Sequence, residues 1–276
     1  MRGRITILCD NTVGPVSGTM GEHGFAALVE RGEEALLFDT GQGGTLLHNA
    51  QRMHRDLHLV ERVVLSHGHY DHTGGLWPLV RSCGPKEVLA HPGVFARRYV
   101  GRDTGERVSV GIPYDEEFLR GQRVRFSLSD QCREIGPGLL LTGEVPRVNP
   151  FEAGDAGLSC DEAGCHPDPI RDDQSLIIRT ERGLVLLLGC CHAGVVNTID
   201  WARETTGVAE VHAVIGGTHL GFCSPRQLDE TVAALRRLDV QKILGSHCTG
   251  FPVAARLAHE FPGRFHPAYV GYTLEI

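Results

Sequence analysis

Short runs in which hydrophobic and polar positions alternate recur along most of the chain, and glycine-containing turns separate many of them. Such runs predict β-strands, here over residues 4–9, 25–30, 35–39, 62–66, 87–90, 175–180, 184–189, 211–215, 242–245 and 270–276. Apolar positions at helical spacing predict helices, here over residues 45–55, 73–81, 225–238 and 252–261 and after Gly194. We therefore expect an α/β fold.

Between about residues 97 and 172 this regular pattern is interrupted. The stretch is rich in glycine, proline and charge, and it contains only two short strand patterns, over 123–128 and 138–141. A long irregular stretch inside a compact domain usually has a functional role. We expect one domain over residues 1–276, in which residues 97–172 form a cover segment over a site.

Two short stretches of the chain resemble each other. Arg62–His67 and Lys242–His247 each consist of a basic residue, an apolar strand and a histidine just beyond the strand. The sites of α/β proteins lie at the carboxyl ends of their strands. The repeat therefore suggests two similar halves, each of which brings one histidine to that edge.

Composition narrows the class of protein further. Hydrophobic residues make up 41% and charged residues 22% of the chain, as in globular proteins, and this excludes a disordered or fibrous chain. The net charge of −7 argues against a basic face for nucleic acid. No apolar run reaches the ~18 residues of a membrane helix, and nine scattered cysteines do not suggest a disulfide framework. We expect a cytoplasmic protein with a small-molecule substrate and neither a nucleic-acid nor a membrane partner. The sequence does not predict the oligomeric state.

The segment Ser66–His72 is the strongest indication of chemistry, because it holds three histidines and an aspartate. Histidine is the commonest metal ligand. Side chains two residues apart in an extended segment point the same way, so His67 and His69 are expected to bind one ion together. Asp71 and His72 begin a helix, face another direction and are expected to reach a second ion.

This spacing resembles a known family. The pattern His67-x-His69-x-Asp71-His72, with Asp39 upstream in Phe38–Gly41, is similar to that of the metallo-β-lactamase superfamily. The resemblance implies a four-layer αββα sandwich with one or two metal ions at the edges of its sheets. It also implies that Asp39 accepts a hydrogen bond and orients the loop that carries the ligands.

Later strand ends offer further candidates. His192, His219 and His247 each follow an apolar strand and lie among glycines, although each also fits a buried core histidine. We expect His192 and His247 to bind metal and His219 to donate a proton to the leaving group.

The sequence departs from the superfamily pattern at Cys190, which stands where the pattern has an aspartate that bridges two metals. The Cys190 thiolate can bind or bridge zinc, or the residue can be a small buried side chain. The pattern's third histidine falls near His166, which has the acidic pair Asp172–Asp173 as a competing neighbour. Either His166 or His192 completes the first metal set, and we favour His192 because its position at a strand end is better defined.

These candidates lead to a mechanism. A zinc ion on His67, His69 and His192 lowers the pKa of bound water to about 7 and supplies hydroxide at neutral pH. A second ion on Asp71, His72 and His247 would hold the other oxygen of the substrate, so Asp71 is expected to be both a ligand and a catalytic residue. We expect two zinc ions, with iron, manganese or nickel as alternatives for such donors.

Within the superfamily, five stretches resemble one branch, whose members are labelled metal-dependent hydrolases and related to a methanopterin-pathway synthase. They are 10–12, 22–25, 38–42, 142–147 and 189–194. The resemblance implies a metal-dependent hydrolase or, alternatively, a transferase that condenses a dihydropterin pyrophosphate with an aryl amine.

The substrate is expected to be small and anionic or phosphorylated. The backbone N–H groups of the helix after Gly194 favour an anion. Arg147 and Arg171 in the cover segment are candidates to pair with it, and His23 is expected at the mouth of the site.

Overall fold

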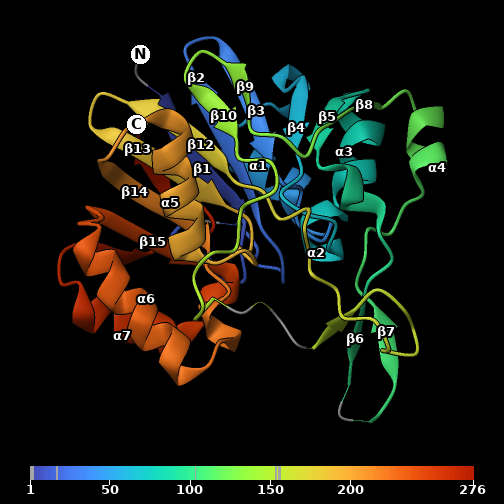
Figure 1. The fold of residues 1–276 in the computed structure, drawn as a ribbon. Helices are drawn as coiled ribbons and strands as arrows, with labels where there is room; N and C mark the ends of the chain where they lie inside the picture. The colour runs from blue at the N-terminus through green and yellow to red at the C-terminus, as the bar shows by residue number, and fades with distance from the viewer. Residues whose placement is uncertain (1–2, 17, 103, 153, 155–156) are drawn as a thin grey trace.

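The computed structural model describes residues 3–16, 18–102, 104–152, 154 and 157–276. Two stacked sheets form its centre (Figure 1). The first has the strand order β17 (Thr273–Glu275), β1 (Gly3–Cys9), β2 (Ala26–Arg31), β3 (Glu34–Phe38), β4 (Arg62–Val64), β5 (Glu87–Ala90) and β8 (Arg125–Leu128). The second has the order β16 (Phe265–Pro267), β15 (Lys242–Ser246), β14 (Val211–Gly217), β13 (Gly183–Leu188), β12 (Leu176–Thr180), β10 (Leu139–Leu141) and β9 (Arg133–Gly136).

Helices cover the outer face of each sheet (Figure 1). The α-helices are α1 (Leu46–Arg52), α2 (Tyr70–Thr73), α3 (Leu76–Cys83), α4 (Glu116–Gly121), α5 (Val195–Thr206), α6 (Pro225–Arg237) and α7 (Phe251–Glu260). Short 3₁₀ turns lie at η1 (Leu57–Leu59), η2 (Pro92–Phe95), η3 (Leu220–Phe222) and η4 (His247–Thr249). The predicted αββα sandwich is therefore confirmed.

Alternation along the strands builds the layers. In β13, Val185 and Leu187 pack between the two sheets, while Leu184, Leu186 and Leu188 pack against the helices on the outer face. A strand buried on both faces needs such a continuous apolar run.

The cover segment is less irregular than expected. Residues 125–128, 133–136 and 139–141 are strands β8, β9 and β10 of the main sheets, so this part of the predicted cover belongs to the sandwich. These strands are short, and β8 and β9 are at sheet edges, which weakens their pattern in the sequence. A separate three-stranded sheet, β11 (Leu158–Ser159), β6 (Tyr99–Gly101) and β7 (Arg107–Ser109), lies outside the sandwich (Figure 1).

The helix predicted over 73–81 is two helices. α2 carries Asp71 and His72, and α3 begins after Gly74 and Gly75. A Cβ atom on Gly75 would lie 2.0 Å from the carbonyl oxygen of Thr40, so only glycine allows the chain to pass here. No helix among the described residues is long and apolar enough to cross a membrane.

Candidate metal centre

Five strands place polar side chains at one edge of the sandwich. β3 and β4 run parallel in the first sheet, and β13, β14 and β15 run parallel in the second. Their carboxyl ends carry, in order, Asp39, His67, His192, His219 and His247. Residues far apart in the sequence therefore meet at this edge, as expected of an α/β site.

His67, His69 and His192 form one group of potential ligands. One ring nitrogen from each lies within 4.8 Å of the others, and all three side chains are buried. Burial lowers the pKa of each, to about 3 for His69, so the rings are neutral. Nε2 of His69 and both ring nitrogens of His192 are buried and have no hydrogen-bond partner among the described residues. Neutral imidazoles with unpaired nitrogens are what a metal ion requires.

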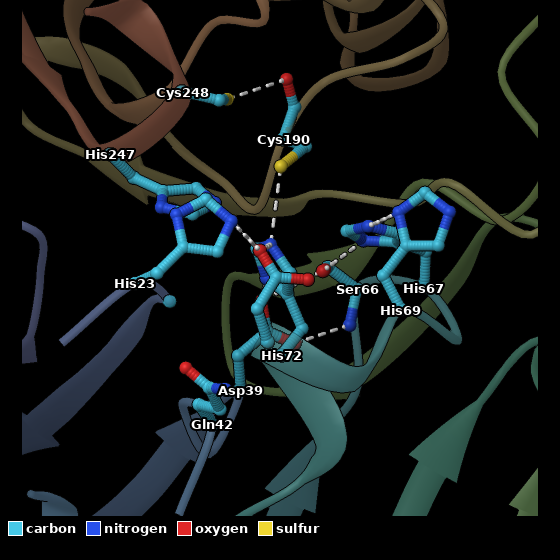
Figure 2. A network of polar contacts seen from close by, with 12 residues as sticks. His23, Asp39, Gln42, Ser66, His67, His69, His72, Cys190, His247 and Cys248 are labelled. Atoms are coloured by element: carbon cyan, nitrogen blue, oxygen red, sulfur yellow. Dashed lines mark hydrogen bonds and ion pairs between the residues drawn. The ribbon is translucent and has the colours of Figure 1, made fainter. Parts of the chain in front are cut away.

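Asp71 is the centre of a second group. Its Oδ2 lies 3.2 Å from Nε2 of His247 and 3.2 Å from Nε2 of His23 (Figure 2 shows the two rings side by side). Burial acts to raise the pKa of Asp71, but the charge of His72 and the hydrogen bonds of His23 and His247 outweigh it and lower that pKa. The carboxylate is therefore ionised and available to a cation.

His72 and Cys190 lie between the two groups. Nε2 of His72 is 3.1 Å from Sγ of Cys190 and 3.8 Å from Oδ2 of Asp71 (Figure 2). We expected His72 to bind an ion with Asp71 and His247, and its ring also lies within 4.8 Å of potential ligand atoms of Cys190 and His67. Burial raises the pKa of the Cys190 thiol, so a bound cation would be needed to deprotonate it.

Asp39 orients the rings of His67 and His72. Its carboxylate accepts hydrogen bonds from the backbone N–H and the hydroxyl of Ser66, each at 2.7 Å, and lies 2.7 Å from Nδ1 of His72. Because the Ser66 hydroxyl gives its hydrogen to Asp39, it accepts one from Nδ1 of His67, 2.9 Å away. Both rings therefore turn Nε2 into the site, and that of His67 presents a lone pair there. Burial acts to lower the pKa of His72, but the carboxylates of Asp39 and Asp71 outweigh it and raise that pKa to about 9, so Nε2 of His72 must give up a proton before it binds a cation. A Cβ on Gly189 would lie 2.1 Å from the Ser66 oxygen, so this network requires glycine there.

A buried ion pair holds the His67–His69 loop from outside. Arg98 donates to Asp168 at 2.9 Å and to Asp172 at 2.9 Å, and the Arg98 side chain is only 2% exposed. Asp172 in turn accepts the backbone N–H of Gly68 at 2.8 Å.

A cavity of about 470 Å³ opens onto these groups. Its walls combine potential ligands with apolar side chains: His23, His69, Tyr70, Asp71, Val100, Val110, Leu158, Cys190, His192, His219, Phe222, His247 and Cys248. The ring of His219 lies 4.2 Å from that of His192 and 4.9 Å from that of Phe222, measured between centroids. Asp39, Cys191, His219 and His247 all have left-handed backbone conformations, a strain that is concentrated at functional sites.

Three residues that were candidates for the site lie elsewhere. His166 is 79% exposed and pairs with Asp161 at 3.0 Å, so of the two alternatives His192 joins His67 and His69. Arg147 is exposed, donates to the carbonyl of Ile170 at 3.1 Å and does not line the cavity. Arg171 is 70% exposed, and its partner is Glu144, 3.9 Å away.

The anion expected at the start of α5 is part of the protein. The buried carboxylate of Glu152 accepts the backbone N–H groups of Val196 and Asn197, each at 2.8 Å. These donors are therefore already satisfied, and this correction removes one argument for a phosphate there.

Sequence reasoning missed Ser66, Asn11 and Arg98. Asn11 is 2.8 Å from Nδ1 of His247 across 236 residues, and Arg98 acts across about 70, so no local pattern reveals either contact. Ser66, next to His67, could have been found from the rule that a ligating histidine binds a partner through its other nitrogen.

Comparison with known proteins agrees with this geometry. The family model of the metallo-beta-lactamase superfamily matches residues 20–162. The chain belongs to the metallo-β-lactamase superfamily. One relative, from Methanocaldococcus jannaschii, is named 7,8-dihydropterin-6-methyl-4-(beta-D-ribofuranosyl)-aminobenzene-5'-phosphate synthase. It is 30% identical, and the match covers 99% of this chain and 96% of the relative.

Solved structures of the superfamily give the same result. Tm1679, described as a metal-dependent hydrolase of the β-lactamase superfamily, has a TM-score of 0.85 and 30% identity, with 99% of both chains covered. Zinc-bound PqqB from Methylobacterium extorquens has a TM-score of 0.60 at 17% identity, covers 99% of this chain and 100% of its own, and supports the fold alone. Divalent metals are bound by members of this superfamily, and the unpaired nitrogens of His69 and His192 fit such an ion.

Proposed function

We propose that the protein is a metal-dependent hydrolase of a small phosphorylated or otherwise anionic ester. The observation that carries the proposal is the group His67, His69 and His192, in which three neutral, buried imidazoles converge beside a cavity of small-molecule size. When bound there, a metal such as zinc supplies a water that is acidic enough to act as a nucleophile at neutral pH.

The chain's own residues supply positioning. Asp39, acting through Ser66 and directly on His72, keeps the Nε2 atoms of His67 and His72 turned into the site. The charged end of a substrate would lie toward Asp71 and the histidines, where Asp71 and His247 are available for a second cation. His219 borders the same cavity and is proposed to donate the proton to the leaving group.

The walls of the cavity suggest the other end of the substrate. Tyr70, Val100, Val110, Leu158 and Phe222 supply the apolar part of its lining. An ester with a phosphate at one end and an apolar or aromatic group at the other would match both parts of the lining. Both the metal identity, zinc, and a cytoplasmic location remain part of this proposal.

The test combines metal analysis with a substrate screen. Untagged protein purified without chelator is expected to contain metal and to hydrolyse members of a panel of phosphate monoesters, phosphodiesters and thioesters. The double variant His67→Ala, His69→Ala is expected to lose the metal and the hydrolysis together. Full metal retention with unchanged turnover in that variant would overturn the proposal.

A second function, transfer to an aryl amine, is favoured by the name of the relative from M. jannaschii. A hydrolase and a transferase differ in the acceptor, which is water or the amine. Offering a dihydropterin pyrophosphate with and without an aryl amine separates them. An amine-dependent product would favour the synthase, and pyrophosphate release at the same rate without amine would favour the hydrolase.

A further inference from the structure

The side-chain amide of Asn11 lies between the rings of His23 and His247. Its Oδ1 is 2.8 Å from Nδ1 of His247, and its Nδ2 is 3.4 Å from Nδ1 of His23. The opposite nitrogens of the two rings, both Nε2, are each 3.2 Å from the same oxygen of Asp71 (Figure 2 shows the two rings). One amide thus contacts both histidines of the second group of potential ligands.

The orientation of this amide is fixed by a third contact. The backbone N–H of Gly24 donates to Oδ1 of Asn11 at 3.3 Å. A backbone N–H can only donate, so the atom that it faces must be the amide oxygen. The NH₂ group of Asn11 is therefore the one that faces His23.

Opposite ring forms follow for the two histidines. The oxygen of Asn11 can only accept, so Nδ1 of His247 carries a hydrogen and its Nε2 presents a lone pair. The NH₂ group of Asn11 can only donate, so Nδ1 of His23 presents a lone pair and its Nε2 carries the hydrogen. At Asp71, one ring thus offers a lone pair and the other offers an N–H.

We propose that Asn11 is a positioning residue that divides the roles of these two histidines, so that His247 is a ligand of the second ion and His23 is a hydrogen-bond donor. His23 then donates from Nε2 to Asp71 or to an anionic group bound in the cavity, and it does not bind metal. The inference rests on the proposed metal centre and assigns separate roles to the two histidines beside Asp71. His23 suits a donor because its side chain is 50% exposed and borders the cavity, whereas His247 is only 1% exposed.

Nitrogen NMR of the intact protein tests the assignment directly. Protein labelled with ¹⁵N-histidine is loaded with ¹¹³Cd and studied at alkaline pH. The expected result for His247 is a protonated Nδ1 and a cadmium coupling at Nε2. The expected result for His23 is a protonated Nε2, an unprotonated Nδ1 and no cadmium coupling. A cadmium coupling to His23, or a hydrogen on its Nδ1, would overturn the proposal, and exposed His266 serves as an internal reference.

Variants at both positions provide a second readout. Asn11→Asp replaces the donor by a second acceptor, so His23 is expected to move its hydrogen to Nδ1 and to gain a cadmium coupling. His23→Phe is expected to keep the metal content of the native protein and to bind inorganic phosphate about 10-fold more weakly, as when one hydrogen bond is lost. His23→Gln keeps an N–H donor and is expected to recover part of that affinity. Loss of a metal equivalent in His23→Phe would contradict the proposal.

Failure of the proposed function gives a different pattern. If the protein binds no cadmium at all, the metal centre is wrong, and neither histidine shows a coupling. If cadmium binds and His23 shows the coupling in the native protein, the metal centre stands and the role given to Asn11 is wrong.

Discussion

The carboxylate of Asp172 accepts the backbone N–H of Gly68 at 2.8 Å, and this bond joins the later part of the cover segment to the loop that carries His67 and His69. The same carboxylate receives two hydrogen bonds from the guanidinium of Arg98. Gly68 has no room for a side chain, because a Cβ there would lie 2.0 Å from the carbonyl oxygen of Val94. The ligand loop is therefore held by groups that never reach the cavity.

Replacement of Arg98 is expected to lower the free energy of unfolding. Arg98→Met leaves the carboxylates of Asp168 and Asp172 buried without their cation, and breaking a buried pair in this way costs about 3–5 kcal/mol. Urea unfolding measures the loss. Arg97→Met, at an exposed neighbouring position, is expected to change the free energy of unfolding by less than about 0.5 kcal/mol. Equal stability of the two variants would show that the ion pair contributes nothing.

Asp39→Asn is expected to weaken metal binding and leave the fold intact. In place of Oδ1 the new amide NH₂ group would face the backbone N–H of Ser66, and in place of Oδ2 it would face the Ser66 hydroxyl and Nδ1 of His72. In either case a donor loses its acceptor, and the support of the two rings is weakened. Loss of such an orienting partner lowers metal affinity by about 10–100-fold. Competition with a chelator measures the affinity, and circular dichroism verifies the fold. An unchanged metal affinity would mean that Asp39 is not needed to orient the rings of His67 and His72.

His192 and His166 form a matched pair for metal analysis. His192→Ala removes one of three converging imidazoles and is expected to cost one metal equivalent per chain. His166→Ala changes an exposed ring beside Asp161 and is expected to retain every equivalent. Elemental analysis of both variants shows which of the two histidines is needed for metal binding. The reverse result would restore His166 as the third ligand.

Cys190 is expected to give an optical signature. Thiolate coordination to cobalt produces a charge-transfer band in the near ultraviolet, so the cobalt-loaded protein should show one and Cys190→Ser should not. Cys132→Ser, a change at a half-buried cysteine of the edge strand region, is the control. A band that persists in Cys190→Ser would point to another thiol, and Cys248, within 4.8 Å of Cys190 and His247, is then the residue to replace.

Glu152 is expected to stabilise the start of α5. Glu152→Ala leaves the N–H groups of Val196 and Asn197 without their acceptor, and loss of a helix cap costs about 1–2 kcal/mol. Thermal unfolding measures this effect. Glu162→Ala, at an exposed position of the same segment, is expected to leave the midpoint unchanged. A stability equal to that of the native protein would contradict the assigned role.

The parts of the site that lie close together in the sequence could be predicted, because spacing alone determines which way their side chains point. His67 and His69 converge as an alternating pair, and His192 follows from its place at the end of an apolar strand. The α/β class was predictable from the periodicity, since β13 and its neighbours are long enough to show their pattern, whereas the αββα sandwich followed from the resemblance to the superfamily.

The remaining features depend on contacts between distant segments. The placement of Asn11 beside His247 and of Asp172 beside Gly68 follows from the packing of whole sheets, which no local pattern encodes. The prediction that a bound anion lies at the start of α5 was wrong for a similar reason, because only the folded chain shows that Glu152 reaches the first turn of this helix.

Part of the apolar lining of the cavity is built on a different piece of structure from the ligands. Val100 and Leu158 belong to the small sheet of β6, β7 and β11, whereas the histidines follow strands of the sandwich. The two parts meet through few backbone bonds, among them Tyr70 N–H to the carbonyl of Val110 at 3.0 Å. Substitutions in the small sheet can therefore change which molecules the cavity accepts while the ligand positions stay fixed. Such a division lets new substrates evolve on an inherited reaction centre.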